Sequence, residues 1–123
     1  MNIIRGFKFT ILTVILILIA ILMPTSGVPT VEIPYADKIV HTGMFVVLTG
    51  CFYIEYLMQK NKLPSTLYVL ISIGVFAILT EVLQSLTPDR TMDIWDLGAD
   101  LMGSIATIGI IKLWYKKKSQ LRL

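Results

Sequence analysis

The sequence LYVLISIGVFAILTEVLQSL, residues 67–86, is an almost continuous apolar run of 20 residues that carries Glu81 and Gln84 near its end. A helix that crosses the hydrocarbon core of a bilayer needs about 20 mostly apolar residues. Three more windows of this kind lie at about residues 3–23, 39–58 and 94–115. Prolines follow the first three windows, as expected where such helices end. The windows predict an all-α polytopic membrane protein, a bundle of four transmembrane helices.

The whole chain of 123 residues is apolar: 55% of them are hydrophobic, 15% are charged, and the mean hydropathy is +0.77. Soluble domains average about 45–50% apolar residues, so the composition disfavours a water-soluble enzyme with its own large core. The length allows a single domain over residues 1–123. Cys51 is the one cysteine, which excludes an intramolecular disulfide and a Cys-rich zinc site.

The first window also resembles a signal peptide, because Arg5 and Lys8 precede its apolar stretch. A small-residue cleavage site of the A-x-A type does not follow, since the chain reads MPTSG at residues 23–27. We therefore expect an uncleaved first span.

The distribution of Lys and Arg predicts the orientation, because cytoplasmic loops carry an excess of these residues. Of the 11 basic residues, only Lys38 and Arg90 fall on one side of the four windows. The other nine are Arg5, Lys8, Lys60, Lys62, Lys112, Lys116, Lys117, Lys118 and Arg122. We expect a protein of the plasma membrane with both termini cytoplasmic and with loops 24–38 and 87–93 outside. The net charge is +3, but the basic residues are placed as membrane topology requires and do not form a recognition module. We therefore expect no binding of nucleic acid.

Seven of the eight acidic residues lie on or near the expected outer side, and only Glu55 lies toward the cytoplasmic end, close to Lys60 and Lys62. Carboxylates inside apolar windows are costly and count as functional candidates. Here they are Glu81, Asp96 and Asp100.

Helical spacing places small and polar residues on one face of each window. The stripes are Asp37, His41, Phe45 and Leu48; Gly74, Ala77, Glu81 and Gln84; and Asp96, Asp100, Gly103 and Thr107. Polar side chains turn inward because lipid cannot satisfy them, and small residues let helices approach. The stripes predict one polar pocket in the outer leaflet, roofed by Asp89, Arg90 and Asp93.

Structural roles remain open for several of these residues. Asp37 and Asp93 could each begin a helix, and Lys38 could be an interfacial anchor. Arg90 could pair with a loop carboxylate, an arrangement of small energetic value when exposed. The complete set of candidate ligand-binding residues is Asp37, Lys38, His41, Glu81, Gln84, Arg90, Asp93, Asp96 and Asp100.

The order and spacing of these residues resemble the VanZ-like family of small bacterial membrane proteins. The resemblance covers about residues 33–110. It rests on DKxxH at residues 37–41, ExxQ at residues 81–84, the loop residue Arg90, and Asp96 at the start of the last window. The family commonly has Asn four residues after that acid, where this chain has Asp100. The founding member is linked to resistance to the glycopeptide antibiotic teicoplanin, so the resemblance implies a role in the cell envelope.

Three classes of function remain open. The first is an accessory protein that binds a lipid-linked envelope precursor or another lipophilic molecule, with membrane lipids as its surroundings. The second is an intramembrane hydrolase or transferase, with His41 or Glu81 as general base and a divalent cation held by Asp93, Asp96 and Asp100. The third is a small transporter, which would need polar groups reachable from both faces. No specific catalytic motif is present, no cofactor other than a divalent cation is implied, and an oligomer is possible.

Overall fold

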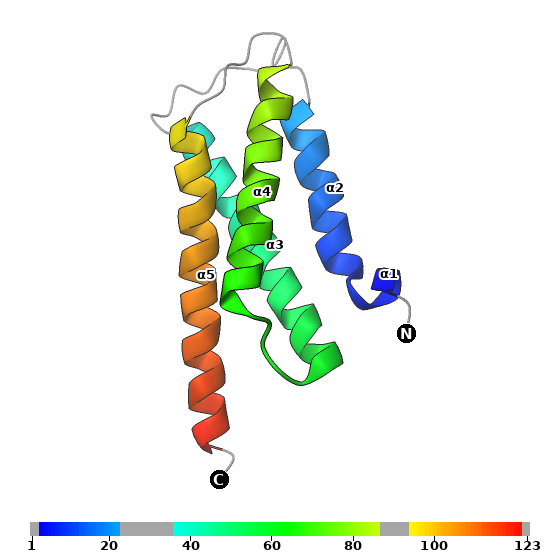
Figure 1. Ribbon diagram of the computed structural model, residues 1–123, viewed down its shortest axis with the longest axis vertical. Helices are drawn as coiled ribbons and strands as arrows, with labels where there is room; N and C mark the ends of the chain where they lie inside the picture. The colour runs from blue at the N-terminus through cyan, green and yellow to red at the C-terminus, as the bar shows by residue number, and fades with distance from the viewer. Residues whose placement is uncertain (1–2, 23–35, 87–93, 122–123) are drawn as a thin grey trace.

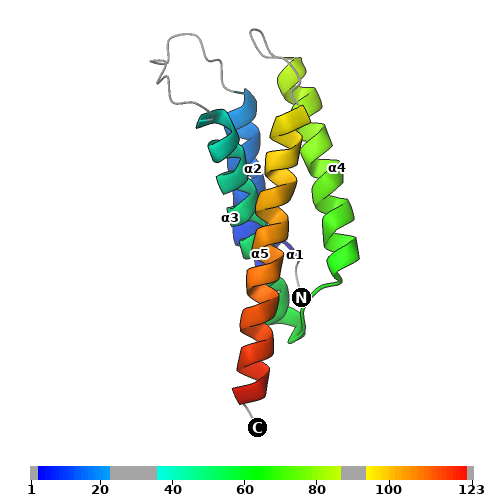
Figure 2. The ribbon, with the colours of Figure 1, turned by 90° about the vertical axis from the view of Figure 1, so that its left-hand side faces the viewer.

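A computed structural model describes residues 3–22, 36–86 and 94–121, and the regular structure of this part of the chain is entirely helical. The helices are α1 (Ile3–Gly6), α2 (Lys8–Leu22), α3 (Ala36–Lys60), α4 (Thr66–Ser85) and α5 (Ile94–Leu121). They run alternately up and down in an elongated bundle (Figure 1), in which α3 packs most extensively against α5. α2 packs on α3 and α4, and α4 also contacts α5 (Figure 2).

The alternation brings the beginning of α1 and the end of α5 to the same end of the bundle (Figure 1). The turn between α3 and α4 lies at that end, so Arg5, Lys8, Lys60 and Lys62 are on one side of the structure. This arrangement groups the basic residues as the orientation argument requires. The cytoplasmic location of that side stays a prediction.

The turn between α3 and α4 follows from its local sequence. Asn61 adopts a φ of 56°, a left-handed conformation that Asn tolerates better than most residues and that ends helices. Pro64 then disfavours further helix, and Ser65 is extended at φ −62° and ψ 124° before α4 begins.

Three of the four expected windows become single helices that are long and apolar enough to cross a membrane: α3 from Lys38, α4 and α5. The first window is divided into α1 and the 15-residue α2, which is shorter than the roughly 20 residues of a typical span. α5 extends to Leu121, beyond the expected end near residue 115.

The helices expose apolar side chains and bury polar ones. On α4, Leu67 is 70% exposed and Val75 is 63% exposed, whereas Thr80 and Glu81 are 1% and 2% exposed. In water this pattern would cost much free energy, but in lipid the apolar faces are solvated and the polar groups find partners inside. The burial pattern is that of a membrane protein.

Most of the described residues of the expected stripes face the interior of the bundle. Two glycines in the stripes, Gly103 and Gly74, differ in how closely another helix approaches them. Gly103 lies against α3 so closely that an added Cβ would be 2.7 Å from the carbonyl oxygen of Thr42. Gly74, by contrast, has open space around its Cα, so it is not a helix-contact glycine. The buried members of the α3 stripe are His41, Phe45 and Leu48.

Candidate functional site

His41, Glu81 and Asp100 come from three helices and meet at one point inside the bundle. The Nδ1 atom of His41 lies 3.1 Å from Oδ1 of Asp100, within hydrogen-bond distance, and 3.9 Å from Oε1 of Glu81. The exposed fractions of the three side chains are 2%, 2% and 0%. Two carboxyl groups therefore lie close to the same nitrogen of the buried imidazole.

Asp96 lies on the other side of the same imidazole ring. Its Oδ2 atom is 3.9 Å from Nε2 of His41, and its Oδ1 atom is 3.4 Å from the Lys38 ammonium. Lys38 is the most accessible member, with its side chain 30% exposed. Gln84, one turn beyond Glu81 on α4, is also buried, at 4% exposed. We call Lys38, His41, Glu81, Gln84, Asp96 and Asp100 the polar centre.

The positions of these residues in their helices explain why they meet. Lys38 and His41 lie in the first two turns of α3, and Asp96 and Asp100 lie in the first two turns of α5. Glu81 lies near the end of α4. Because α3 and α5 begin at the end of the bundle where α4 finishes (Figure 1), all of these turns share one level.

The charges of the polar centre are unbalanced among the described residues. Three carboxyl groups accompany a single ammonium group, that of Lys38. Buried carboxylates are tolerated only where hydrogen bonds and opposite charges stabilise them. The arrangement can bind a cation or the amine and hydroxyl groups of a polar ligand, and it presents an ammonium at its accessible edge.

The structure brings together six of the nine candidate residues. Arg90 and Asp93 lie outside the described residues, and so does the side chain of Asp37. The expected roof of the pocket, which includes Asp89, also lies outside them. Asp100 was expected to hold a cation together with Asp93 and Asp96, whereas His41 and Glu81 were expected to act as bases. In the structure Asp100 is grouped with His41 and Glu81, and the ligand atoms of these three residues lie within 4.8 Å of one another.

Sequence reasoning missed a second polar contact, at the other end of the bundle. Glu55 accepts hydrogen bonds from the backbone N–H groups of Phe9, at 3.0 Å, and Thr10, at 2.7 Å. It lies at the end of the bundle where the sequence places it, near Lys60 and Lys62, and there it is 7% exposed and binds the first turn of α2. The signal was present, because Glu55 is also a carboxylate within an apolar window and needs a partner.

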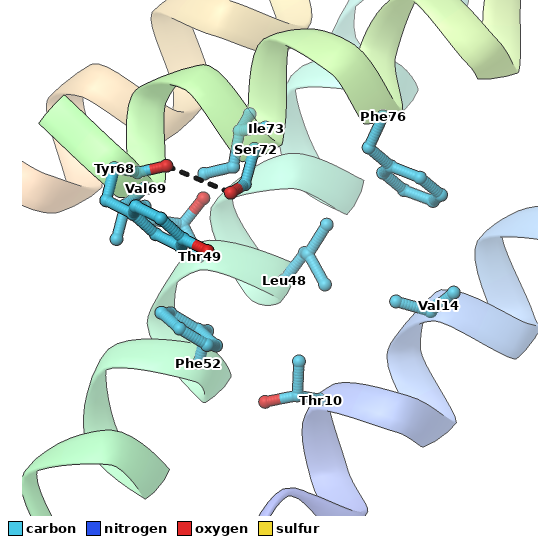
Figure 3. Close-up of a pocket in the computed structure, with 10 residues that line it drawn as sticks. All are labelled: Thr10, Val14, Leu48, Thr49, Phe52, Tyr68, Val69, Ser72, Ile73 and Phe76. Carbon is cyan, nitrogen blue, oxygen red and sulfur yellow. Dashed lines mark hydrogen bonds between the residues drawn. The ribbon is translucent and has the colours of Figure 1, made fainter. Parts of the chain in front are cut away.

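A mainly apolar cavity of about 270 Å³ lies between α2, α3 and α4 (Figure 3). Its lining includes Val14, Leu48, Phe52 and Phe76, with Thr10 and Thr49 among the few polar residues. These residues come from the half of the bundle that contains the turn between α3 and α4. The cavity therefore lies deeper in the bundle than the polar centre.

The fold and the site define a class: an all-helical membrane protein whose helices enclose a polar centre near one end. Within that class, the chain belongs to the VanZ/LLP1 family, whose sequence model matches residues 2–115. This membership confirms the resemblance seen in the polar motifs.

The chain is also similar to the Schizosaccharomyces pombe protein C11E3.10, which is described as uncharacterized. The two are 28% identical over 109 residues, which cover 88% of this chain and 66% of the yeast protein. The chain thus spans just under two thirds of the length of this relative, which comes from a fungus rather than a bacterium. No solved structure matches the chain.

Proposed function

We propose that this protein is an accessory binding protein of the cell envelope that holds the polar head of a lipid-linked or lipophilic molecule. In this proposal it lies in the bacterial plasma membrane, and the polar centre faces the outer leaflet. The observation that carries the proposal is the burial of His41, Glu81 and Asp100 between three helices. A set of ionisable groups at membrane depth is expensive and is expected to have a functional partner.

The polar centre has complementary groups for such a head. The Lys38 ammonium suits a phosphate or carboxylate, while the carboxyl groups suit amines, hydroxyls or a bridging cation. Arg90 is proposed to assist Lys38, and Asp37 and Asp93 are proposed to complete the set. A change in glycopeptide susceptibility would then follow if the molecule held is an envelope precursor.

The apolar cavity supports an amphiphilic ligand rather than a soluble one. Leu48 and Phe52, which line it, follow His41 along α3 by seven and eleven residues. At 1.5 Å per residue these positions lie roughly 10 and 16 Å below the imidazole. A hydrocarbon chain that hangs from a head group at the polar centre would reach this depth.

The experiment is to purify the protein from bacterial membranes in mild detergent and to identify the co-purified lipids by mass spectrometry. We expect one lipid class to be enriched about tenfold over the bulk membrane in the wild type. Glu81→Gln should abolish the enrichment, because it keeps the shape of the side chain and removes its charge. Gly74→Ala is the matched control on α4, since its new methyl group enters open space. Equal lipid profiles for the wild type and Glu81→Gln would refute the proposal.

A second candidate function is hydrolysis or group transfer on a lipid head. The contact between His41 Nδ1 and Asp100 Oδ1 favours it, because a carboxylate can orient an imidazole that acts as general base. A comparison of the total lipids of a deletion strain and the wild-type strain tests this function. Accumulation of one lipid in the deletion strain, with a product of that lipid present only in the wild type, would favour the enzyme.

A further inference from the structure

The donor atoms of His41, Glu81 and Asp100 match the chemistry of a transition-metal site. One imidazole nitrogen and one oxygen from each of two carboxyl groups lie within 4.8 Å of one another. Zn²⁺ takes nitrogen at about 2.0–2.1 Å and carboxylate oxygen at about 2.0–2.2 Å, which separates ligand atoms by roughly 3.4 Å in a tetrahedral site. The distances from Nδ1 to the two oxygens, 3.1 and 3.9 Å, bracket that separation.

We propose that His41, Glu81 and Asp100 bind one divalent first-row transition-metal ion, for which Zn²⁺ is the best match. An imidazole ligand favours Zn²⁺ and its neighbours over Mg²⁺ and Ca²⁺, which prefer oxygen alone. Three protein ligands leave one coordination position for water or a ligand atom, as in catalytic zinc sites. The site does not depend on lipid binding, so it can be tested separately from the proposed function.

Asp96 supports this assignment through the second ring nitrogen. A histidine that binds metal through one nitrogen commonly donates its other N–H to a carboxylate. Asp96 Oδ2 is 3.9 Å from Nε2 of His41, on the side where such a carboxylate would lie but beyond hydrogen-bond distance, and the Lys38 ammonium is 3.4 Å from Asp96 Oδ1. With Nδ1 as the metal ligand, Nε2–H would point to Asp96.

The charge of the polar centre also agrees with a divalent cation. Its described residues include three carboxyl groups close to the imidazole of His41. Carboxylate oxygens are common ligands of divalent cations. The alternative without metal is a proton held between His41 and Asp100, and the experiment distinguishes the two.

The experiment uses the full chain, without a histidine tag, purified in detergent and stripped with a chelator. Zn²⁺ is then titrated by calorimetry, and bound zinc is counted by elemental mass spectrometry. We expect one Zn²⁺ per chain, retained in the presence of excess Mg²⁺. His41→Gln, Glu81→Gln and Asp100→Asn should each lower the affinity by more than about 100-fold, and Asp96→Asn by about tenfold.

Glu55→Gln is the control, because Glu55 is also a buried carboxylate but lies outside the cluster. It should bind Zn²⁺ like the wild type. The variants of His41, Glu81 and Asp100 could fail to fold. In that case X-ray absorption spectroscopy of the zinc-loaded wild type tests the site, because the proposal requires one imidazole nitrogen among the zinc ligands. Absence of zinc binding by the folded wild type, or zinc without imidazole, would overturn the metal site while leaving the lipid analysis unaffected.

Discussion

The side chain of Glu55, late in α3, accepts a hydrogen bond of 2.6 Å from the hydroxyl of Thr10, at the start of α2. The same carboxylate accepts the backbone N–H groups of Phe9 and Thr10. The first N–H groups of a helix lack partners within the helix, and in a membrane they cannot turn to water. Glu55 therefore fixes the beginning of the short helix α2 to α3.

We predict that Glu55→Gln destabilises the bundle by about 1–3 kcal/mol, because the amide has one acceptor oxygen in place of two and its NH₂ group faces N–H donors. Thermal unfolding in detergent, followed by circular dichroism, measures the effect. Ser72→Ala is the control, since this exposed hydroxyl donates to the carbonyl of Tyr68 on its own helix. Identical melting of the wild type and Glu55→Gln would contradict the prediction.

Gly103→Ala should separate α3 from α5. The added Cβ would lie 2.7 Å from the backbone oxygen of Thr42, and a backbone atom cannot move aside as a flexible side chain can. Overpacking of this kind costs about 1–3 kcal/mol. Gly109→Ala on the same helix enters open space and should be neutral or slightly stabilising, because Ala favours helix. The two melting temperatures provide the comparison, and equal values would show that the helices are not in close contact.

Asp100 should tolerate Asn better than Leu. Asn keeps an oxygen that can accept the proton of His41 Nδ1. Leu fits the apolar surroundings but leaves His41 without this bond in a buried site. We expect the yield of monodisperse protein in gel filtration to be close to that of the wild type for Asp100→Asn and much lower for Asp100→Leu. Equal loss from both would argue against the contact.

The orientation can be tested by labelling of single cysteines in a Cys51→Ala background. Both termini and the turn at Asn61 are predicted to be cytoplasmic, so a cysteine at Thr30 should react with an impermeant thiol reagent in intact cells. A cysteine at Asn61 should react only after the cells are opened. The reverse pattern would invert the topology and place the polar centre toward the cytoplasm.

Much of the fold follows from local sequence. The apolar windows predicted the bounds of α3, α4 and α5 to within a few residues, except that α5 ends later than expected. They did so because length and hydropathy decide which segments can lie in lipid. The division of the first window between α1 and α2 was not foreseen, and Gly6 is the one local feature that could have indicated it.

The sequence by itself determined that the polar residues share one end of the bundle, since helical periodicity and alternating helix direction depend only on the order of the chain. Tertiary structure alone decided that His41 meets Asp100 and Glu81 on one side of its ring and Asp96 on the other. It also decided that Glu55 binds the start of α2 rather than the nearby lysines. The reason is physical: these contacts extend over 3 to 4 Å, and the rotation and separation of packed helices determine which side chains come that close.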